Sequence, residues 1–436
     1  SLGLVGSEMC IRDRVKPDQL TVEVLDYVFR GVGDPAEISR KAGVEESILK
    51  QMREEFLYWY PVDMRISAKE LVPNHLTFYL FQHIAIFEPR LWPRGIGVNG
   101  MVKIEGEKMS KSKGNFIPLK KAIQLYGADT TRATLLLAAE DLDDPDWRDK
   151  NAREVRSMLD IILRTCREVA STDSSKSTEM DSWLLSILQK RIKSITSAME
   201  NLKTRTAISE ALYGLYNDWR WYLRRNGGAI GEAARRFVED WVKLLAPFIP
   251  FTAEECWSIL GKNSFVSVER WPEPDESLID EARELEEDLL RRLMEDIRSI
   301  IEVYGRKPQK IIIYVAADEK RKVLDKALEI LDSKPKNPIG ELIKWMISQN
   351  IVERKKAPTL AKLIFDTLTA YTSNYKPETL RKVAENELSF YHKAVEFLEQ
   401  EFSAKIEVYR EGEPEIYDPK NKAGSALPLR PGIYLE

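Results

Sequence analysis

The sequence has few of the residues that build disulfide frameworks and metal sites. It holds three cysteines and three histidines among 436 residues. The cysteines, Cys10, Cys166 and Cys256, are odd in number and far apart, which argues against a disulfide framework and against a zinc site. No apolar run reaches the length of a membrane-spanning helix, so no membrane partner is expected. Together these features predict a reducing, cytoplasmic setting.

The chain also lacks an excess of positive charge. Its formal net charge is −4, so any RNA binding must come from local basic surfaces. Two short helices between Val15 and Pro61 resemble a helix-turn-helix, but no basic recognition face follows them, so DNA is not an expected partner. His75 and His83 are too far apart on one helix to share a metal ion, so no metal site is expected. The length predicts about two to four domains.

One stretch stands out, Gly106–Asn115, which reads GEKMSKSKGN. Gly106 and Gly114 give the backbone the φ freedom that a closing loop needs, and lysine ammonium groups can neutralise charge on a departing pyrophosphate. The Walker pattern GxxxxGK[ST] is absent. The alternative is a solvated basic turn. The lysines are Lys108, Lys111 and Lys113, with Lys103 just before them.

A half α/β unit precedes this loop. Asp63–Ser67 is predicted to be a strand, Ala68–Leu71 a turn, and Asn74–Phe87 an apolar helix. Ligands bind at the carboxyl edge of such strands, and Glu70 lies there. Its carboxylate suits hydrogen bonds from a ribose; the alternative is an acid favoured by the helix dipole. If the sheet is incomplete, apolar surface is expected around Met64–Ile66 and along the helix.

The acidic stretch Glu140–Asp149 suits a connector between domains. Its closely spaced carboxylates could form a cation site, but the glycine of a calcium loop is missing. A solvated loop is the favoured interpretation.

Long helical segments follow over Asn151–Glu295, in the pattern of an antiparallel helix bundle. Within them, aromatic and basic residues alternate around Trp219, Arg220 and Arg224. Such side chains can stack on unpaired bases. For Trp219 and Tyr222 individually, helical spacing favours a position that faces the core.

From Lys310 onward the pattern changes to a small α/β domain. Ile311–Val315 and Lys405–Tyr409 are predicted strands. The tail, Tyr417–Glu436, lacks a clear period and could dock on a partner or on the body of the protein. It carries Lys420, Lys422 and Arg430 among prolines.

Several stretches, in order, resemble archaeal-type leucyl-tRNA synthetases, which are class I aminoacyl-tRNA synthetases. They are Met64–Phe78, Trp92–Asn115 and the end, Pro431–Glu436. Leu244–Trp257 with Val268–Pro272 resembles the anticodon-binding helical domain that leucyl, isoleucyl, valyl and methionyl enzymes share. The resemblance implies a multidomain α/β plus all-α fold. The expected parts are a non-native linker (1–14), the C-terminal half of a Rossmann-like catalytic domain (15–105), the KMSKS loop with a stem-contact region (106–150), an anticodon-binding helical bundle (151–300) and a C-terminal α/β tRNA-binding domain (301–436).

The resemblance implies ATP-dependent activation of leucine, with Mg2+ accompanying ATP, and transfer of leucine to its tRNA. Lys108 and Lys111 are the expected catalytic residues. The expected ATP-binding residues are Lys108, Met109, Ser110, Lys111, Ser112, Glu70 and His75. The expected tRNA-binding residues are Trp219, Arg220, Arg224, Lys420, Lys422 and Arg430.

The HIGH-type motif and the editing domain of these synthetases do not occur in the sequence. The expectation is therefore a C-terminal fragment that does not activate leucine alone. Two alternatives stay open: a non-catalytic tRNA-binding module, and an isoleucyl-, valyl- or methionyl-type synthetase.

Overall fold

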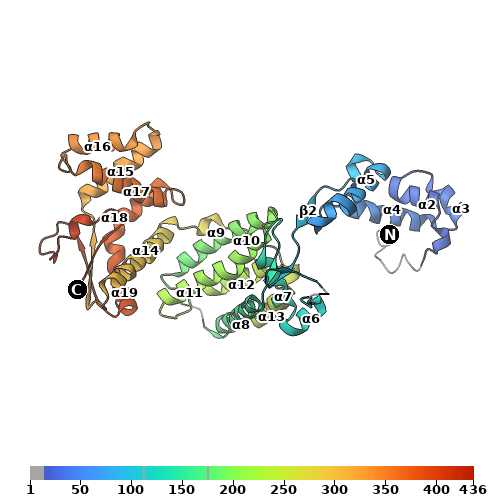
Figure 1. Ribbon diagram of the computed structural model, residues 1–436, viewed down its shortest axis with the longest axis horizontal. Helices are drawn as coiled ribbons and strands as arrows, with labels where there is room; N and C mark the ends of the chain where they lie inside the picture. The colour runs from blue at the N-terminus through green and yellow to red at the C-terminus, as the bar shows by residue number, and fades with distance from the viewer. Residues whose placement is uncertain (1–13, 111, 113, 174–175) are drawn as a thin grey trace. The chain divides into compact units, whose positions relative to one another are not determined.

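The computed structural model describes residues 14–110, 112, 114–173 and 176–436, so the expected linker lies almost wholly outside the described residues (Figure 1). The chain divides into two compact units. The first holds the residues up to Ile162 with Ile195–Ser209 and Ala246–Thr252; the second holds Leu163–Ser194, Glu210–Leu245 and Ala253–Glu436. Helices with small sheets confirm the expected multidomain α/β plus all-α fold. Among the described helices, none has the length and hydrophobicity needed to cross a bilayer.

The first unit begins with a small bundle of three helices. Thr21 and Asp34 cap the first two by accepting backbone N–H bonds, and Gly31 and Gly43 end them in the left-handed conformation. Their apolar faces meet in one core that includes Phe56. The helices are α2 (Val22–Arg30), α3 (Pro35–Ala42) and α4 (Glu46–Trp59), preceded by a 3-10 turn at Pro17–Gln19.

A two-stranded parallel sheet follows in the first unit. Strand β1 (Arg65–Ala68) pairs in register with β2 (Ile96–Asn99), so both strands end at the same edge. The chain between them forms a 3-10 turn (Lys69–Leu71), a π-helix (Val72–Leu76), α5 (Thr77–Ile86) and a 3-10 turn (Pro89–Leu91). His83 is buried on α5 and lies 3.3 Å from the Tyr60 hydroxyl, so it is a core residue.

The rest of the first unit surrounds a short three-stranded sheet in the order β4-β3-β5. Asp129 accepts a hydrogen bond from Thr252 N, and Arg132 donates to the carbonyls of Pro247 and Phe248. These bonds hold residues 246–252 against α7. The elements are β3 (Lys103–Ile104), β4 (Glu107–Lys108), β5 (Asp146–Trp147), α6 (Leu119–Tyr126), α7 (Ala128–Ala138) and α10 (Thr204–Ser209).

The second unit contains a helical core built on three fully buried tryptophans, Trp183, Trp219 and Trp241. Arg191 supports it by pairing with the buried Asp218 at 2.7 Å. The helices are η6 (Glu210–Gly214), α11 (Leu215–Arg225), α12 (Ala233–Leu245) and α14 (Glu281–Tyr304). Three further helices contribute residues to both units: α8 (Asp149–Ser171), α9 (Asp181–Glu200) and α13 (Pro250–Ile259).

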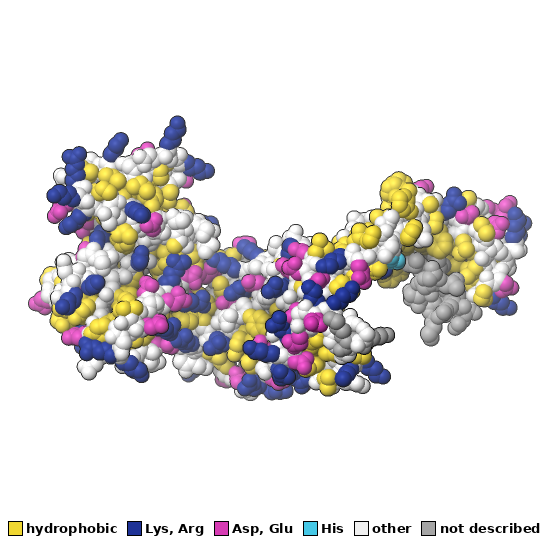
Figure 2. All heavy atoms as spheres, viewed as in Figure 1, with side chains coloured by type: hydrophobic (Ala, Val, Ile, Leu, Met, Phe, Trp, Pro, Cys, Tyr) yellow, Lys and Arg dark blue, Asp and Glu magenta, His cyan; other side chains and the backbone are white. Residues whose placement is uncertain are grey.

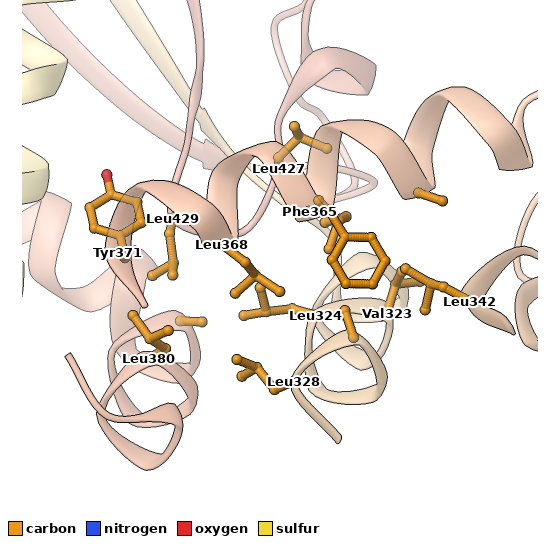
Figure 3. Close-up of a cluster of buried hydrophobic side chains, with 14 of the residues drawn as sticks. Val323, Leu324, Leu328, Leu342, Phe365, Leu368, Tyr371, Leu380, Leu427 and Leu429 are labelled. Atoms are coloured by element: carbon orange, nitrogen blue, oxygen red, sulfur yellow. The ribbon is translucent and has the colours of Figure 1, made fainter. Parts of the chain in front are cut away.

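The carboxyl-terminal part of the second unit joins a sheet to a helical cluster. Strand β6 (Lys310–Val315) lies between parallel β7 (Lys405–Arg410) and antiparallel β8 (Gly432–Leu435). Side chains from helices of this part and from Leu427 and Leu429 form one core (Figure 3). The helices are α15 (Asp318–Ser333), α16 (Pro338–Ser348), α17 (Ala357–Tyr371), α18 (Pro377–Lys393) and α19 (Val395–Phe402); short 3-10 turns lie at Val266–Val268, Glu276–Leu278 and Ala423–Ser425.

Candidate functional site

The lysine-rich stretch begins as a β-hairpin. Lys103 on β3 pairs with Lys108 on β4, and the chain turns at Glu105 and Gly106. Gly106 has a φ of +82° and Gly114 a φ of +70°, conformations that disfavour side chains. Lys108 is an exposed residue of β4, at the base of the loop. The two glycines lie at the two ends of the loop, as expected, and the chain before it forms two separate strands, β2 and β3.

Asn115 closes the loop on its own base. Its side-chain oxygen accepts a hydrogen bond from Ser110 N at 2.8 Å, and its amide nitrogen donates to the Lys108 carbonyl at 3.1 Å. The Ser110 and Ser112 hydroxyls lie 2.8 Å apart. Met109 is half-buried beside them. Lys111, the second expected catalytic lysine, lies outside the described residues.

The acidic connector holds the base of the hairpin in place. The Asp144 carboxylate pairs with Lys69 at 2.6 Å and with Lys103 at 3.1 Å, and it accepts a bond from Met101 N at 2.8 Å. These hydrogen bonds, that from Lys69 first, hold the pKa of Asp144 well below its ordinary value. Because the ion pairs need a charged carboxylate, they persist from neutral into mildly acidic pH.

A second aspartate of the connector fixes the turn itself. The Asp146 carboxylate accepts a hydrogen bond from Gly106 N at 2.7 Å and pairs with Arg148 at 2.8 Å. These two contacts lower its pKa. The segment also forms β5, which pairs with β3 in parallel. The predicted solvated loop is found at the exposed residues 141–143, whereas Asp144 and Asp146 bind protein cations and amides. Among the residues described, no group of three or more His, Cys, Asp or Glu side chains is placed to hold a metal ion.

Gly100 allows the connector to come this close. A Cβ at this position would lie 2.0 Å from the Asp143 carbonyl oxygen, which is shorter than any van der Waals contact. Gly100 directly follows β2, so the connector packs against the carboxyl edge of the small parallel sheet. A side chain at position 100 would displace the loop base.

Glu70 and His75 lie beside this edge. Glu70 is exposed in the 3-10 turn that directly follows β1, next to Lys69, whose ammonium group joins the Asp144 network. His75 is exposed, and its Nε2 lies 3.3 Å from the guanidinium of Arg65. The structure thus connects the segment that carries Glu70 to the base of the lysine hairpin. That either side chain contacts a nucleotide stays a prediction.

We expect Asp144→Ala to loosen the hairpin without unfolding the unit. The substitution removes the shared partner of Lys69 and Lys103 and the acceptor for Met101 N, so amide hydrogen exchange across residues 101–108 should rise by roughly tenfold. Asp143→Ala is the matched control, because the side chain of Asp143 is exposed and its backbone is unchanged. Equal exchange in the two variants would show that the acidic connector does not brace the loop.

Two of the three expected RNA-binding residues of α11, Trp219 and Arg224, make contacts within the second unit. Trp219 is 1% exposed and stacks on Tyr222 and Phe237, so the RNA-contact interpretation is corrected to the core alternative. Aromatic spacing alone could not distinguish these two roles. The Arg224 guanidinium is bound by Glu401. Arg220 is exposed, 5.8 Å from the Tyr216 ring, and stays a predicted RNA contact.

The tail docks on its own domain through β8, which pairs with β6 and leaves three basic residues exposed. Lys422 and Arg430 line a cleft of about 420 Å³, and Arg430 also lines a second cleft of about 370 Å³ with Arg292. Lys420 is exposed a few residues away. The structure thus brings two of the three expected tail residues to one cleft. Deleting Tyr417–Glu436 would remove a sheet strand, so it is not a clean test of RNA binding.

An apolar face is exposed on the first unit, as predicted for an incomplete sheet. On α5, Phe78 is 66% exposed, Phe81 65% and Ile84 52%, and Ile66 of β1 is 54% exposed. Figure 2 shows hydrophobic side chains gathered over α5. Neighbouring aromatics at the end of α4, Tyr58 and Trp59, are also exposed. Large apolar side chains exposed together on neighbouring elements are typical of a surface that another element covers.

Comparison with known proteins gives two family matches. Residues 43–159 match class I (M) tRNA synthetases, and residues 181–313 match the anticodon-binding domain of tRNA ligase. The first match contains the lysine hairpin and the acidic connector, Glu140–Asp149, and the second contains the tryptophan core.

Curated relatives match nearly the whole chain. The leucine–tRNA ligase of Methanothrix thermoacetophila is 40% identical over 428 residues, covering 97% of this chain and 44% of that protein. The enzyme of Methanosarcina acetivorans is 38% identical, covering 96% of this chain and 44% of the relative. That of Aeropyrum pernix is 40% identical, covering 97% and 43%. The chain therefore spans less than half the length of the relatives it matches.

Proposed function

This chain belongs to the leucine–tRNA ligase family, and we propose that it supplies the lysine loop and the tRNA-binding parts of an enzyme that activates leucine with ATP and transfers it to leucine tRNA. The observation that carries the proposal is the lysine hairpin, whose base is held by the ion pairs of Asp144. One of these ion pairs links the hairpin to the turn after β1 that carries Glu70. The chain around them is 35–40% identical to these ligases. The amino-acid substrate is proposed from the family, ahead of isoleucine, valine and methionine.

Lys108 would stabilise the negative charge that develops on the departing pyrophosphate. When the leucine carboxylate attacks the α-phosphorus of ATP, pyrophosphate leaves and its negative charge grows in the transition state. An ammonium group on a hinged loop can stabilise that charge without being fixed in the free protein. Mg2+ would enter with ATP as part of the substrate, and Lys111, Glu70 and His75 are proposed to contact the nucleotide.

The isolated chain is proposed to bind tRNA without activating leucine. The exposed apolar face of α5 favours this, because such a face is typical of a surface that another element covers. The test joins the chain, from Val15 onward, to the part of the Methanothrix relative that the match does not cover. Leucine-dependent ATP–pyrophosphate exchange should appear in the joined protein and be absent from the chain alone. Exchange by the chain alone, or none in a folded joined protein, would contradict the proposal.

The basic residues of the tail should contribute affinity for leucine tRNA that depends on salt. Replacing Lys420, Lys422 and Arg430 together by alanine should weaken binding and reduce the slope of log affinity against log salt by about 2–3, if each contacts a phosphate. The matched control replaces three exposed basic residues of the first unit, Arg40, Lys41 and Lys50. A slope that is the same in both triple variants and in the wild type would remove the tail from the proposed tRNA surface.

A further inference from the structure

A carboxylic acid is fully buried beneath the tail. Glu387 of α18 is 1% exposed, and its Oε2 accepts a hydrogen bond from Leu429 N at 3.0 Å. Its other oxygen has no hydrogen-bond partner among the described residues, and the same is true of the nearby Tyr391 hydroxyl. Burying a carboxyl group with one oxygen unbonded costs folding free energy, so its position indicates a specific role.

The bond from Leu429 holds a turn of unusual shape. Leu427 and Arg430 exchange two backbone hydrogen bonds of 2.9 Å, and Leu429 between them has a φ of +64°. A leucine rarely adopts this left-handed conformation, which persists only where surrounding contacts enforce it. Two contacts do so here: the Leu429 side chain is 2% exposed in the core shown in Figure 3, and its N–H is held by Glu387.

The turn determines where Arg430 lies. Arg430 is exposed at the end of the turn and lines both clefts described above, one with Arg292 and one with Lys422. A shift of the turn would therefore move one guanidinium relative to two other cations. Spacing between cations matters for a ligand that carries charges at fixed intervals, as an RNA backbone does.

We propose that Glu387 is a positioning residue: its carboxyl group fixes the Leu427–Arg430 turn so that Arg430 meets a phosphate of bound RNA between the two clefts. The identity of that RNA as leucine tRNA rests on the proposed function. The positioning itself rests on the geometry of α18 and the tail.

Glu387 can hold the turn in its uncharged form. Burial raises its pKa to about 8, so at neutral pH the acid is mostly protonated and a glutamine is its close isostere. A folded-state pKa above the ordinary value means that the group's contribution to stability is lost as pH rises toward and through about 8. The ionisable groups that interact with it are Tyr391 of α18 and Tyr371 of α17. Beside these tyrosines lie Asp288, Arg292 and Asp296 of α14, and Arg430 of the tail lines a cleft with Tyr371.

The test compares Glu387→Gln with Glu387→Leu in the full chain. Glutamine keeps an acceptor for Leu429 N, whereas leucine removes it. At pH 7, amide exchange of the peptide containing Leu427–Arg430 should match wild type in the glutamine variant and be roughly tenfold faster in the leucine variant. If the leucine variant does not fold, protection at pH 9 decides: it should fall in wild type and persist in the glutamine variant.

RNA binding distinguishes positioning from a general structural role. Affinity for a leucine tRNA transcript at fixed salt should fall by the same factor in Glu387→Leu and Arg430→Ala, with no further loss in the double variant, and glutamine should restore it. Additive losses, an unchanged Arg430→Ala affinity, or normal protection in Glu387→Leu would overturn the proposal. If the wild-type chain does not bind leucine tRNA, the proposed function fails, and amide exchange alone decides whether Glu387 positions the turn.

Discussion

Replacing Lys108 by alanine is expected to lower leucine-dependent ATP–pyrophosphate exchange by roughly 100- to 1,000-fold in the joined protein. The reason is that Lys108 is exposed at the base of a loop with glycines at both ends, where its charge would be available to a bound nucleotide. The measurement is the initial rate of labelled pyrophosphate incorporation into ATP at saturating leucine and ATP.

Lys120→Ala is the matched control for this prediction. Lys120 is an exposed lysine at the start of α6 in the same unit, outside the loop. Its replacement should change the exchange rate less than about twofold, because a distant exposed charge is screened by solvent and salt. Equal losses in the two variants would indicate a general effect of charge. An unchanged exchange rate in Lys108→Ala would show that Lys108 has no role in leucine activation.

Replacing Trp219 by alanine should lower the free energy of unfolding of the second unit by about 3–5 kcal/mol. The side chain is 1% exposed and stacked between two aromatic rings, so alanine leaves a large cavity in the tryptophan core. Urea unfolding followed by far-ultraviolet circular dichroism measures the change.

Two variants accompany Trp219→Ala. Arg220→Ala changes the next, exposed residue and should shift the unfolding free energy by no more than about 0.5 kcal/mol. Trp219→Phe keeps an aromatic ring in the core and should retain part of the stability. If Trp219→Ala unfolds at the wild-type urea concentration but binds tRNA less tightly, the core assignment is wrong and this tryptophan faces RNA.

The lysine loop with its flanking glycines could be predicted from sequence because its determinants are local, whereas the β3–β4 hairpin at its base was not predicted. Two glycines, four lysines and a short strand lie within a few residues of one another. The contacts of the acidic connector could not be predicted in the same way, because Asp146 reaches Gly106 across 40 positions of sequence. Composition identified Glu140–Asp149 as charged, but only the fold shows which cations and amides it meets.

The helical stripe and the tail illustrate two further limits. Alternating aromatics and arginines at Trp219–Arg225 fit both a core face and an RNA face, since periodicity does not say which side is covered. The tail has no clear period because β8 is four residues long and owes its pairing to β6. Glu387 gave no signal at all in the sequence, as its burial follows from the packing of α18 under the tail.

The most direct test of the central claim is the affinity of the 436-residue chain for leucine tRNA against methionine tRNA, measured at the same salt concentration. A chain that supplies the tRNA-binding parts of a leucine–tRNA ligase should bind leucine tRNA at least about tenfold more tightly, and the preference should shrink in the variant that lacks Lys420, Lys422 and Arg430. Equal affinity for the two tRNAs would contradict the account.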